Sequence, residues 1–353
     1  MKRIDERHTM FARMNYKEGT YQYNDYYKNN MDKKDLDDEI RKKPNLCGPG
    51  TMSYDPINSL MAEAAFMFLQ DIHSLAEKPP AENKTEIPKD VISKRLKGLS
   101  IHYGACLAST LEMKDYHYYS HRGRLSESYG EEVTPLHPYG IVFAVEMDKD
   151  MLNRGPQVSE IIETSKAYVD VSIIGMILSY YIRSLGYEAR NHMDANYLVV
   201  APLVALDGGI GDIGRNGIIT TRKYGSRVRL GVVTTNMPLN QDPKDTFGLD
   251  YFCDFCRNCS IVCPGKAIEK GNKTLINNNL RWQINQEKCY DRWRSLGTDC
   301  GICISACPFS QGVDMDHIKT FEDNPEEAKN ILKEFRDTYK IRPYIKDPPS
   351  WLK

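Results

Sequence analysis

The sequence contains two cysteine-rich stretches, FCDFCRNCSIVCPG at residues 252–265 and CYDRWRSLGTDCGICISACPFS at residues 289–310. The first has the spacing C-x2-C-x2-C-x3-C-P, and the second has the spacing C-x10-C-x2-C-x3-C-P. This arrangement is typical of bacterial ferredoxins, in which cysteine thiolates hold [4Fe–4S] clusters. The sequence therefore predicts a redox protein with two such clusters.

Each cluster needs four thiolates, and in two-cluster ferredoxins the fourth cysteine of each run binds the other cluster. We therefore expect two ligand sets: Cys253, Cys256, Cys259 and Cys307 for one cluster, and Cys289, Cys300, Cys303 and Cys263 for the other. Zinc sites rarely use this spacing, and disulfide scaffolds belong to small secreted domains rather than to a chain of 353 residues. Cys47 and Cys106 lie outside the pattern and are expected to be ordinary buried thiols.

The composition argues against several classes of protein. The chain carries 47 basic and 48 acidic residues, which gives no electrostatic footprint for non-specific nucleic-acid binding. A transmembrane helix needs about 18 consecutive apolar residues, and the chain has no such run. The first residues contain neither the apolar core of a secretory signal nor a twin arginine. Together with iron–sulfur ligation, these features predict a cytoplasmic protein without a membrane partner.

The chain divides into four predicted regions. Residues 1–50 are polar and rich in tyrosine, and we expect them to form an extended arm with little core of its own. Residues 51–248 have room for an ordinary folded domain in front of the cysteine-rich module at 249–320. Residues 321–353 are expected to form a C-terminal helix and tail.

Hydrophobic periodicity predicts helices over about 55–78, 91–98 and 323–340. A long helix is expected to begin after Ser159, a plausible N-cap, and to end at Gly186, where a left-handed residue is easily accommodated. Apolar runs predict strands at three places, namely 140–147, 196–203 and 227–235. Alternating strands and helices indicate an α/β core.

A glycine-rich loop follows in the sequence GGIGDIGRNG at residues 208–217. Gly209, Gly211 and Gly214 form a G-x-G-x-x-G pattern, but a dinucleotide fold would place an acidic residue about twenty positions later, where this chain reads GVVTTN. We instead expect these glycines to let the backbone approach a large flat or phosphate-bearing group, with Arg215 as a fixed cation.

Thr164 and Tyr168 are four residues apart on the predicted long helix, so they share one face. A tyrosine that faces a cavity beside an arginine can deliver a proton, because the cation stabilises the phenolate that remains. The alternative is a packed core tyrosine, which is common in a chain with 22 tyrosines.

Several motifs, taken in order, resemble the cobalamin-dependent reductive dehalogenase family. Besides the two cysteine-rich stretches, three earlier segments carry the resemblance, namely SYYIRSLGYEARNHMDANY (179–197), GDIGRNG (211–217) and RVRLGVVTTNMPL (227–239). SHRGR (120–124) and HPYGIVFAVEMD (137–148) resemble the soluble, signal-less branch of that family. The resemblance covers roughly residues 45–315.

The resemblance implies a nitroreductase-like α/β (α+β) core that holds base-off cobalamin without a lower protein ligand, and a ferredoxin-like module that delivers electrons from an external ferredoxin or flavodoxin. It implies Tyr168 as proton donor to a small organohalide and Arg215 as its partner cation. An asparagine also lines the family's site, and of Asn191 and Asn196 we favour Asn196. The expected cofactor contacts are Thr164, His192, Gly209, Gly211, Gly214 and Asn216.

Two other functions stay open. Epoxyqueuosine reductase, a tRNA-modifying relative of this family, shares the cofactors and uses an aspartate acid, for which Asp194 is the nearby candidate. A non-catalytic electron carrier or corrinoid-handling protein would have clusters but no closed substrate cavity. Asp71 and His73 resemble part of the corrinoid motif D-x-H-x-x-G, but alanine replaces its glycine, so we expect His73 to be a helix-surface histidine.

Overall fold

The protein is described by a computed structural model that covers residues 1–276, 279–313 and 318–353. Its centre is a four-stranded antiparallel sheet in the order β1-β2-β6-β3. The strands are β1 (Leu107–Glu112), β2 (Tyr139–Glu146), β3 (Ala189–His192) and β6 (Val228–Thr235). The expected mixture of helices and strands is confirmed, and the predicted strands at 140–147 and 227–235 correspond to β2 and β6.

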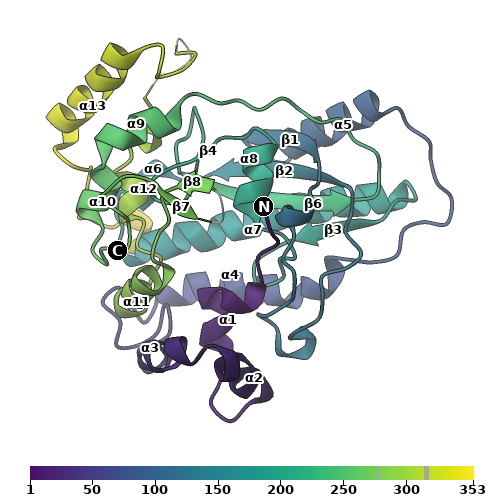
Figure 1. Ribbon diagram of the computed structural model, residues 1–353, viewed down its shortest axis with the longest axis horizontal. Coiled ribbons are helices and arrows are strands. Elements are labelled where there is room, and N and C mark those ends of the chain that lie inside the picture. Colours follow the sequence, from purple (N-terminus) through teal and green to yellow (C-terminus); the bar gives the residue numbers. More distant parts are fainter. Residues whose placement is uncertain (277–278, 314–317) are drawn as a thin grey trace.

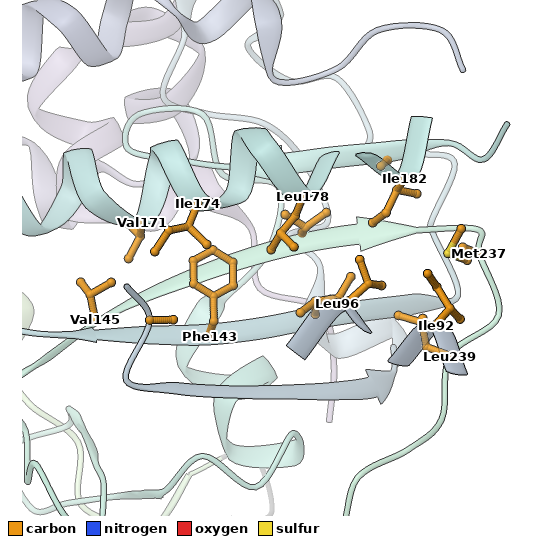
Figure 2. Packing of buried hydrophobic residues seen from close by; sticks show 14 of the residues in the cluster. Ile92, Leu96, Phe143, Val145, Val171, Ile174, Leu178, Ile182, Met237 and Leu239 are labelled. Carbon is orange, nitrogen blue, oxygen red and sulfur yellow. The ribbon is translucent and has the colours of Figure 1, made fainter. Parts of the chain in front are cut away.

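Alternation along β2 explains how helices cover both faces of the sheet (Figure 1). Ile141, Phe143 and Val145 pack towards α7 (Val158–Ser184) and α5 (Lys89–His102), because successive side chains of a strand point to opposite faces. Figure 2 shows this layer, in which Phe143 and Val145 of the strand meet Val171, Ile174 and Leu178 of the helix. Val142 and Ala144 face the other way, towards α8 (Ala201–Asp207).

The long helix α7 starts slightly earlier than predicted, since Gln157 occupies the N-cap and Ser159 lies buried inside the first turn. Its end agrees with the sequence, because Gly186 has a φ of +84° just beyond the C-cap. α4 (Ser59–Asp71) runs along α7 and confirms the helix predicted there. The predicted strand at 196–203 is wrong, because Pro202 stands in the first turn of α8.

The N-terminal region is helical, so the prediction of an extended arm is wrong. It forms α1 (Met10–Asn15), α2 (Tyr21–Asn29) and α3 (Met31–Arg41). Tyr16, Tyr23, Tyr26 and Tyr27 build a small aromatic core with Ala12. The fully buried Arg13 pairs with Asp37 at 2.5 Å and with Glu287 of the cysteine-rich module at 2.8 Å.

The cysteine-rich module lies at one end of the sheet (Figure 1). Its elements are α9 (Leu249–Cys256), α10 (Asn258–Val262), β7 (Thr274–Ile276), β8 (Asn279–Arg281), α11 (Gln286–Leu296) and α12 (Ile302–Ser305). α13 (Pro325–Tyr339) confirms the predicted C-terminal helix. Short segments complete the fold, namely α6 (Lys149–Leu152), β4 (Asp212–Ile213) and β5 (Ile219–Thr220). None of the helices described here is both long and apolar enough to cross a bilayer.

Candidate active site

Four cysteines surround one cavity in the module. Cys253 and Cys256 come from α9, Cys259 from α10, and Cys307 from the end of the second run. Leu249, Phe252, Pro308 and Phe309 complete the wall with apolar carbon. Arg215, Asn216, Thr220 and Arg257 add polar groups to the lining. A cavity lined by four cysteines among apolar side chains, with two arginines nearby, matches the needs of one anionic iron–sulfur cluster.

The other four cysteines also lie together. Burial raises the pKa of Cys289 to about 11, and the neighbouring sulfur of Cys263 adds to the rise. Burial likewise raises the pKa of Cys303, and the sulfurs of Cys300, Cys259, Cys289 and Cys263 contribute in the same direction. One sulfur of the first set, that of Cys259, therefore also lies near Cys303. Buried thiols of this kind stay protonated unless a metal or a cluster compensates the charge of the thiolate.

Arg215 does not reach Tyr168, which corrects the pairing implied by the resemblance. Its guanidinium donates to the backbone carbonyls of Cys253 (3.0 Å), Glu269 (3.0 Å) and Gly271 (2.7 Å), and it stacks over Trp282 at 4.2 Å. The Arg215 guanidinium therefore binds the backbone of the first cysteine-rich stretch and of the residues that follow it.

Tyr168 is instead paired with Arg229, the second residue of β6. The guanidinium carbon of Arg229 lies 4.2 Å from the centre of the Tyr168 ring, and Nη1 donates to the phenol oxygen at 3.3 Å. Burial raises the pKa of Tyr168, whereas Arg229 acts to lower it. The phenol thus stays protonated at neutral pH, and the Arg229 cation would stabilise the phenolate that forms when the proton is released.

Asp299 links this pair to the second cysteine run. Its Oδ2 accepts a hydrogen bond from the Thr164 hydroxyl at 2.9 Å and lies 3.8 Å from Arg229. Arg229 also donates to the Thr164 hydroxyl at 3.3 Å. Since Asp299 directly precedes Cys300, one loop supplies both a predicted cluster ligand and the carboxylate that orients the arginine.

A buried glutamate supports that loop from α7. Glu160 accepts a hydrogen bond from the Thr298 hydroxyl at 2.7 Å, and burial followed by the nearby Asp299 carboxylate raises its pKa. Gly301 has a φ of +60°, and a Cβ there would lie 2.9 Å from the Glu160 side chain. Only glycine fits this turn without displacing the glutamate.

A second group of charged and aromatic side chains lies close enough to Tyr168 to act on its phenol. Arg124 lies 3.6 Å from Asp194, and both carry charge that acts on the Tyr168 phenol. Tyr197 belongs to the same group, and burial and then Tyr168 raise its pKa. The N-terminal region positions Arg124 in this group, because Glu6 accepts hydrogen bonds from the backbone amides of Gly123 (2.7 Å) and Arg124 (3.3 Å).

The two asparagines play different parts. Asn196 accepts from Arg190 at 2.7 Å and donates to the carbonyl of His73 at 3.4 Å, beside rather than at the Tyr168 pair. Asn191 is buried under α7, where it donates to the Ser172 carbonyl at 3.0 Å. The role of Asn196 in the site stays a prediction.

The two histidines are tied into the fold. His192 is fully buried between the amide of Leu198 (3.1 Å) and the hydroxyl of Thr234 (2.9 Å), so both ring nitrogens are engaged. It would need to move to contact a cofactor. His73 is half-buried, and its Nε2 lies 2.7 Å from the Asp194 carbonyl.

The glycine-rich loop serves packing within the chain. A Cβ on Gly209 would lie 2.4 Å from the Pro243 carbonyl, and one on Gly211 would lie 2.4 Å from the Thr220 carbonyl. Gly214 and Asn216 border the cavity of the first cysteine set. A dinucleotide site would require a helix after Gly214, but there the chain forms a turn and then β5, which pairs back with β4.

The residues that sequence reasoning missed are Arg229, Asp299 and Arg124. All three lie inside strings that carried the family resemblance, namely RVRLGVVTTNMPL, TDCGICISACPFS and SHRGR. No local signal identified them, because Arg229 comes near Tyr168 only through the register in which β6 pairs with β2.

Comparison with known proteins agrees with this picture. A family model described as a 4Fe-4S dicluster domain matches residues 252–311. The tetrachloroethene reductive dehalogenase of Sulfurospirillum multivorans is 35% identical over 179 residues, which is 49% of this chain and 35% of that protein. The epoxyqueuosine reductase of Lactococcus garvieae is 27% identical over 128 residues, 35% of each chain.

Among solved structures, the catabolic reductive dehalogenase NpRdhA, in complex with 3-bromo-4-hydroxybenzoic acid, superposes with a TM-score of 0.74 at 21% identity. The match covers 96% of this chain and 46% of that one. The chain thus matches about a third of the length of its first sequence relatives and about half of that solved chain. The shared fold and the sequence matches confirm what the motifs predicted: this chain is related to the reductive dehalogenases.

Proposed function

We propose that the protein is a cobalamin-dependent reductase in which two [4Fe–4S] clusters pass electrons to base-off cobalamin and Tyr168 donates a proton, most favourably for reductive dehalogenation of a small organohalide. The observation that carries this proposal is the Tyr168–Arg229 pair, fixed by Asp299 next to a cluster ligand. The relatives named as reductive dehalogenases give the reaction class.

The residues present fit the cofactors. The two cysteine groups would each hold one cluster, with Cys263 and Cys307 exchanged between the two runs. The partly exposed side chains around Tyr168, which include Tyr197 and Arg124, would border the corrinoid and the substrate. When bound, cobalamin supplies the low-potential reduction of the carbon–halogen bond, which no side chain can provide.

The side chains would handle the proton and the charge. Reductive dehalogenation consumes two electrons and one proton, replaces the carbon–halogen bond with a carbon–hydrogen bond and releases halide. The Tyr168 hydroxyl would give its proton to the carbon that loses the halide. Arg229 would then stabilise the phenolate, and Asp299 together with Thr164 would keep the guanidinium over the ring.

A second candidate is reduction of a non-halogenated substrate, as in epoxyqueuosine reductase. The observation that favours it is Asp194, a carboxylate that faces Tyr168 and pairs with Arg124. The nearly neutral net charge of −1 argues against a tRNA substrate. We further propose a cytoplasmic protein that takes electrons from an external ferredoxin or flavodoxin; a non-catalytic electron carrier would leave the Tyr168 pair without a role.

The proposal can be tested by anaerobic reconstitution of the full chain with iron, sulfide and cobalamin. About eight irons and one corrinoid per chain are expected, with an EPR signal of base-off cobalamin. Lack of stoichiometric corrinoid binding would sink the proposal. Turnover with reduced viologen on halogenated phenols, halogenated alkanes and an epoxyqueuosine-containing stem-loop would then separate the two candidate functions.

A further inference from the structure

The cysteine-rich module concentrates positive charge. Residues 257–288 contain six lysines and arginines and two acidic residues, which gives this segment a net charge of +4 in a chain whose net charge is −1. Lys273 is paired with Asp250 at 2.5 Å. The other five cations are exposed, and none forms an ion pair with a residue that the structure describes: Arg257, Lys266, Lys270, Arg281 and Lys288. Exposed cations without counter-charges attract anionic partners over a range set by the salt concentration.

The positive charge lies beside the cavity of the first cysteine set. Arg257 lines that cavity together with Cys253. Arg215 lines it as well, and its guanidinium binds the Gly271 carbonyl at 2.7 Å and stacks over Trp282 at 4.2 Å. The loop before β7 and the residue after β8 therefore pack on the wall of this cavity. A protein bound to the hairpin would lie next to the cluster that we propose for the first cysteine set.

The second cysteine set lies on the side of the candidate active site. Cys300 directly follows Asp299, whose carboxylate lies 3.8 Å from Arg229. The two sets approach one another where the sulfur of Cys259 contributes to the raised pKa of Cys303. An electron that arrives at the basic side of the module therefore meets the first set before the second, and the second set before the active site.

The β7–β8 hairpin adds an exposed apolar contact to this charge. Leu275 and Leu280 are cross-strand partners, so their side chains lie on the same face of the hairpin, and they are 71% and 65% exposed. Lys270 precedes the hairpin, and Arg281 directly follows Leu280. We call these four residues the β7–β8 surface. Complexes of redox proteins use small interfaces, below about 1,200 Å², and two leucines with basic neighbours suit an interface of that size.

We propose that the β7–β8 surface binds an acidic carrier protein that delivers one electron at a time to the first cluster. This inference rests on the proposed function, because that function requires a source of electrons. Each encounter oxidises the reduced carrier by one electron and reduces the first cluster by one electron, and two encounters supply the two electrons of one turnover. The charge selects an acidic partner. The position beside the first cysteine set selects a redox protein among acidic partners, because binding of RNA or of an anionic membrane does not depend on a neighbouring cluster.

The test is binding of an acidic plant-type [2Fe–2S] ferredoxin to the reconstituted full chain, measured by calorimetric titration at low and high salt. The wild type is expected to bind the ferredoxin at low salt. Binding should weaken as salt rises, because the range of charge interactions falls from about 30 Å at 0.01 M to about 3 Å at 1 M. Lys270→Glu combined with Arg281→Glu should weaken the binding at low salt at least about tenfold.

Lys94→Glu combined with Arg95→Glu is the matched control. These residues are also one lysine and one arginine, both are exposed, and neither pairs with an acidic residue among those that the structure describes, so the change in net charge is the same. They lie on α5, which is well separated from the module in Figure 1. The control should bind the ferredoxin within about twofold of the wild type, because salt screens charges at that separation.

Hydrogen exchange of the wild type gives a second readout that needs no variant. Amides of residues 272–276 and 279–282 should gain protection when the ferredoxin is added, while those of α5 should not change. Absence of binding, binding that does not depend on salt, or a Lys270→Glu/Arg281→Glu variant that binds as tightly as the wild type would overturn the inference. So would an RNA stem-loop that protects the hairpin when the ferredoxin does not.

Electron transfer is measured separately from binding. Reduced ferredoxin should bleach the visible absorption of the clusters, and a bound ferredoxin that fails to do so would exclude this surface as the entry point of electrons. Reduced viologen needs no docking surface. If viologen-driven turnover is intact but the ferredoxin does not bind, this inference fails and the proposed function stands. If the wild type binds no cobalamin and shows no turnover with viologen, the proposed function itself fails.

Discussion

Replacing Arg229 with glutamine removes the cation that faces Tyr168 and keeps a side chain of similar shape. The guanidinium lies 4.2 Å from the ring centre and donates to the phenol oxygen at 3.3 Å. If Tyr168 is the proton donor, this change acts on the step in which the phenolate forms, and binding of substrate should change little.

The size of the effect follows from the geometry. Two unit charges 4 Å apart interact by about 4 kcal/mol at an effective dielectric constant of about 20. Arg229 is 21% exposed and Asp299 lies 3.8 Å away, so solvent and the carboxylate cancel part of that interaction. We therefore expect a loss of about 2–3 kcal/mol, which is roughly a hundredfold fall in kcat.

The pH dependence of the rate gives a second test, because the direction of its shift in Arg229→Gln can be predicted independently of the size of the rate loss. Arg229 acts to lower the pKa of Tyr168 against the effect of burial, so its removal raises that pKa further. A proton donor works below its pKa, and the alkaline fall in rate should therefore move to higher pH in Arg229→Gln. Iron and cobalamin content should stay at the wild-type level.

The assay is steady-state turnover with reduced viologen across neutral to alkaline pH. Arg222→Gln is the matched control, because Arg222 is also 21% exposed, also pairs with an aspartate and also stacks over an aromatic ring, that of Phe247. It should keep kcat within about twofold. The reasoning is refuted if Arg229→Gln with full cofactor content keeps kcat within threefold of the wild type.

Four further changes probe the rest of the site and the fold. Tyr168→Phe should lose about 10²- to 10⁴-fold in kcat with unchanged iron content, and survival of turnover would exclude it as donor. Asp299→Asn keeps an oxygen for Thr164 but removes an anion that raises the pKa of Tyr168, so the alkaline fall in rate should move to lower pH, opposite to Arg229→Gln. Cys303→Ser should leave about four irons of about eight, as a colorimetric iron assay would show. Arg13→Met should destabilise the chain by about 3–5 kcal/mol in denaturant unfolding because it strands the buried Asp37, and adding Asp37→Asn should recover part of that loss.

Local patterns were enough to predict the cysteine module and the central elements. The spacing of cysteines around tight turns is a property of a few adjacent residues, and the module that it predicts is confirmed over residues 252–311. The exchange of Cys263 and Cys307 between two clusters stays a prediction. The same holds for β2, whose uninterrupted apolar run marks a strand covered on both faces.

The partner of Tyr168 could not be predicted in this way. Arg215 and Arg229 both follow Tyr168 by tens of residues, and no local signal separates them. Arg229 reaches the phenol only because β6 pairs antiparallel with β2 in a register that sets it opposite Val145. Strand register is fixed by the packing of the whole sheet, so a sequence string identifies the residue only after the fold is known.

The prediction of an extended N-terminal arm was wrong for a related reason. Its helices are short and polar, and isolated helices of this length are marginal in water. They are held by tyrosine rings that pack on one another and by Arg13, which reaches Glu287 across 274 residues of chain. The apolar residues at 196–203 predicted a strand, but α8 begins within this segment. Pro202 fits there because its missing amide is tolerated in the first turn of a helix.

The position of Asp299 couples the structure of the cysteine-rich module to that of the tyrosine site. Asp299 is the residue before Cys300, and Glu287, which binds Arg13, is two residues before Cys289. Folding of the second cysteine run therefore fixes Arg229 over Tyr168 on one side and the N-terminal helices on the other. Glu6, which lies just before those helices, in turn binds the backbone amide of Arg124. A chain that failed to assemble this run would lose the Arg229–Tyr168 geometry together with the cysteine arrangement, so the proton transfer and the electron transfer that we propose would be lost together.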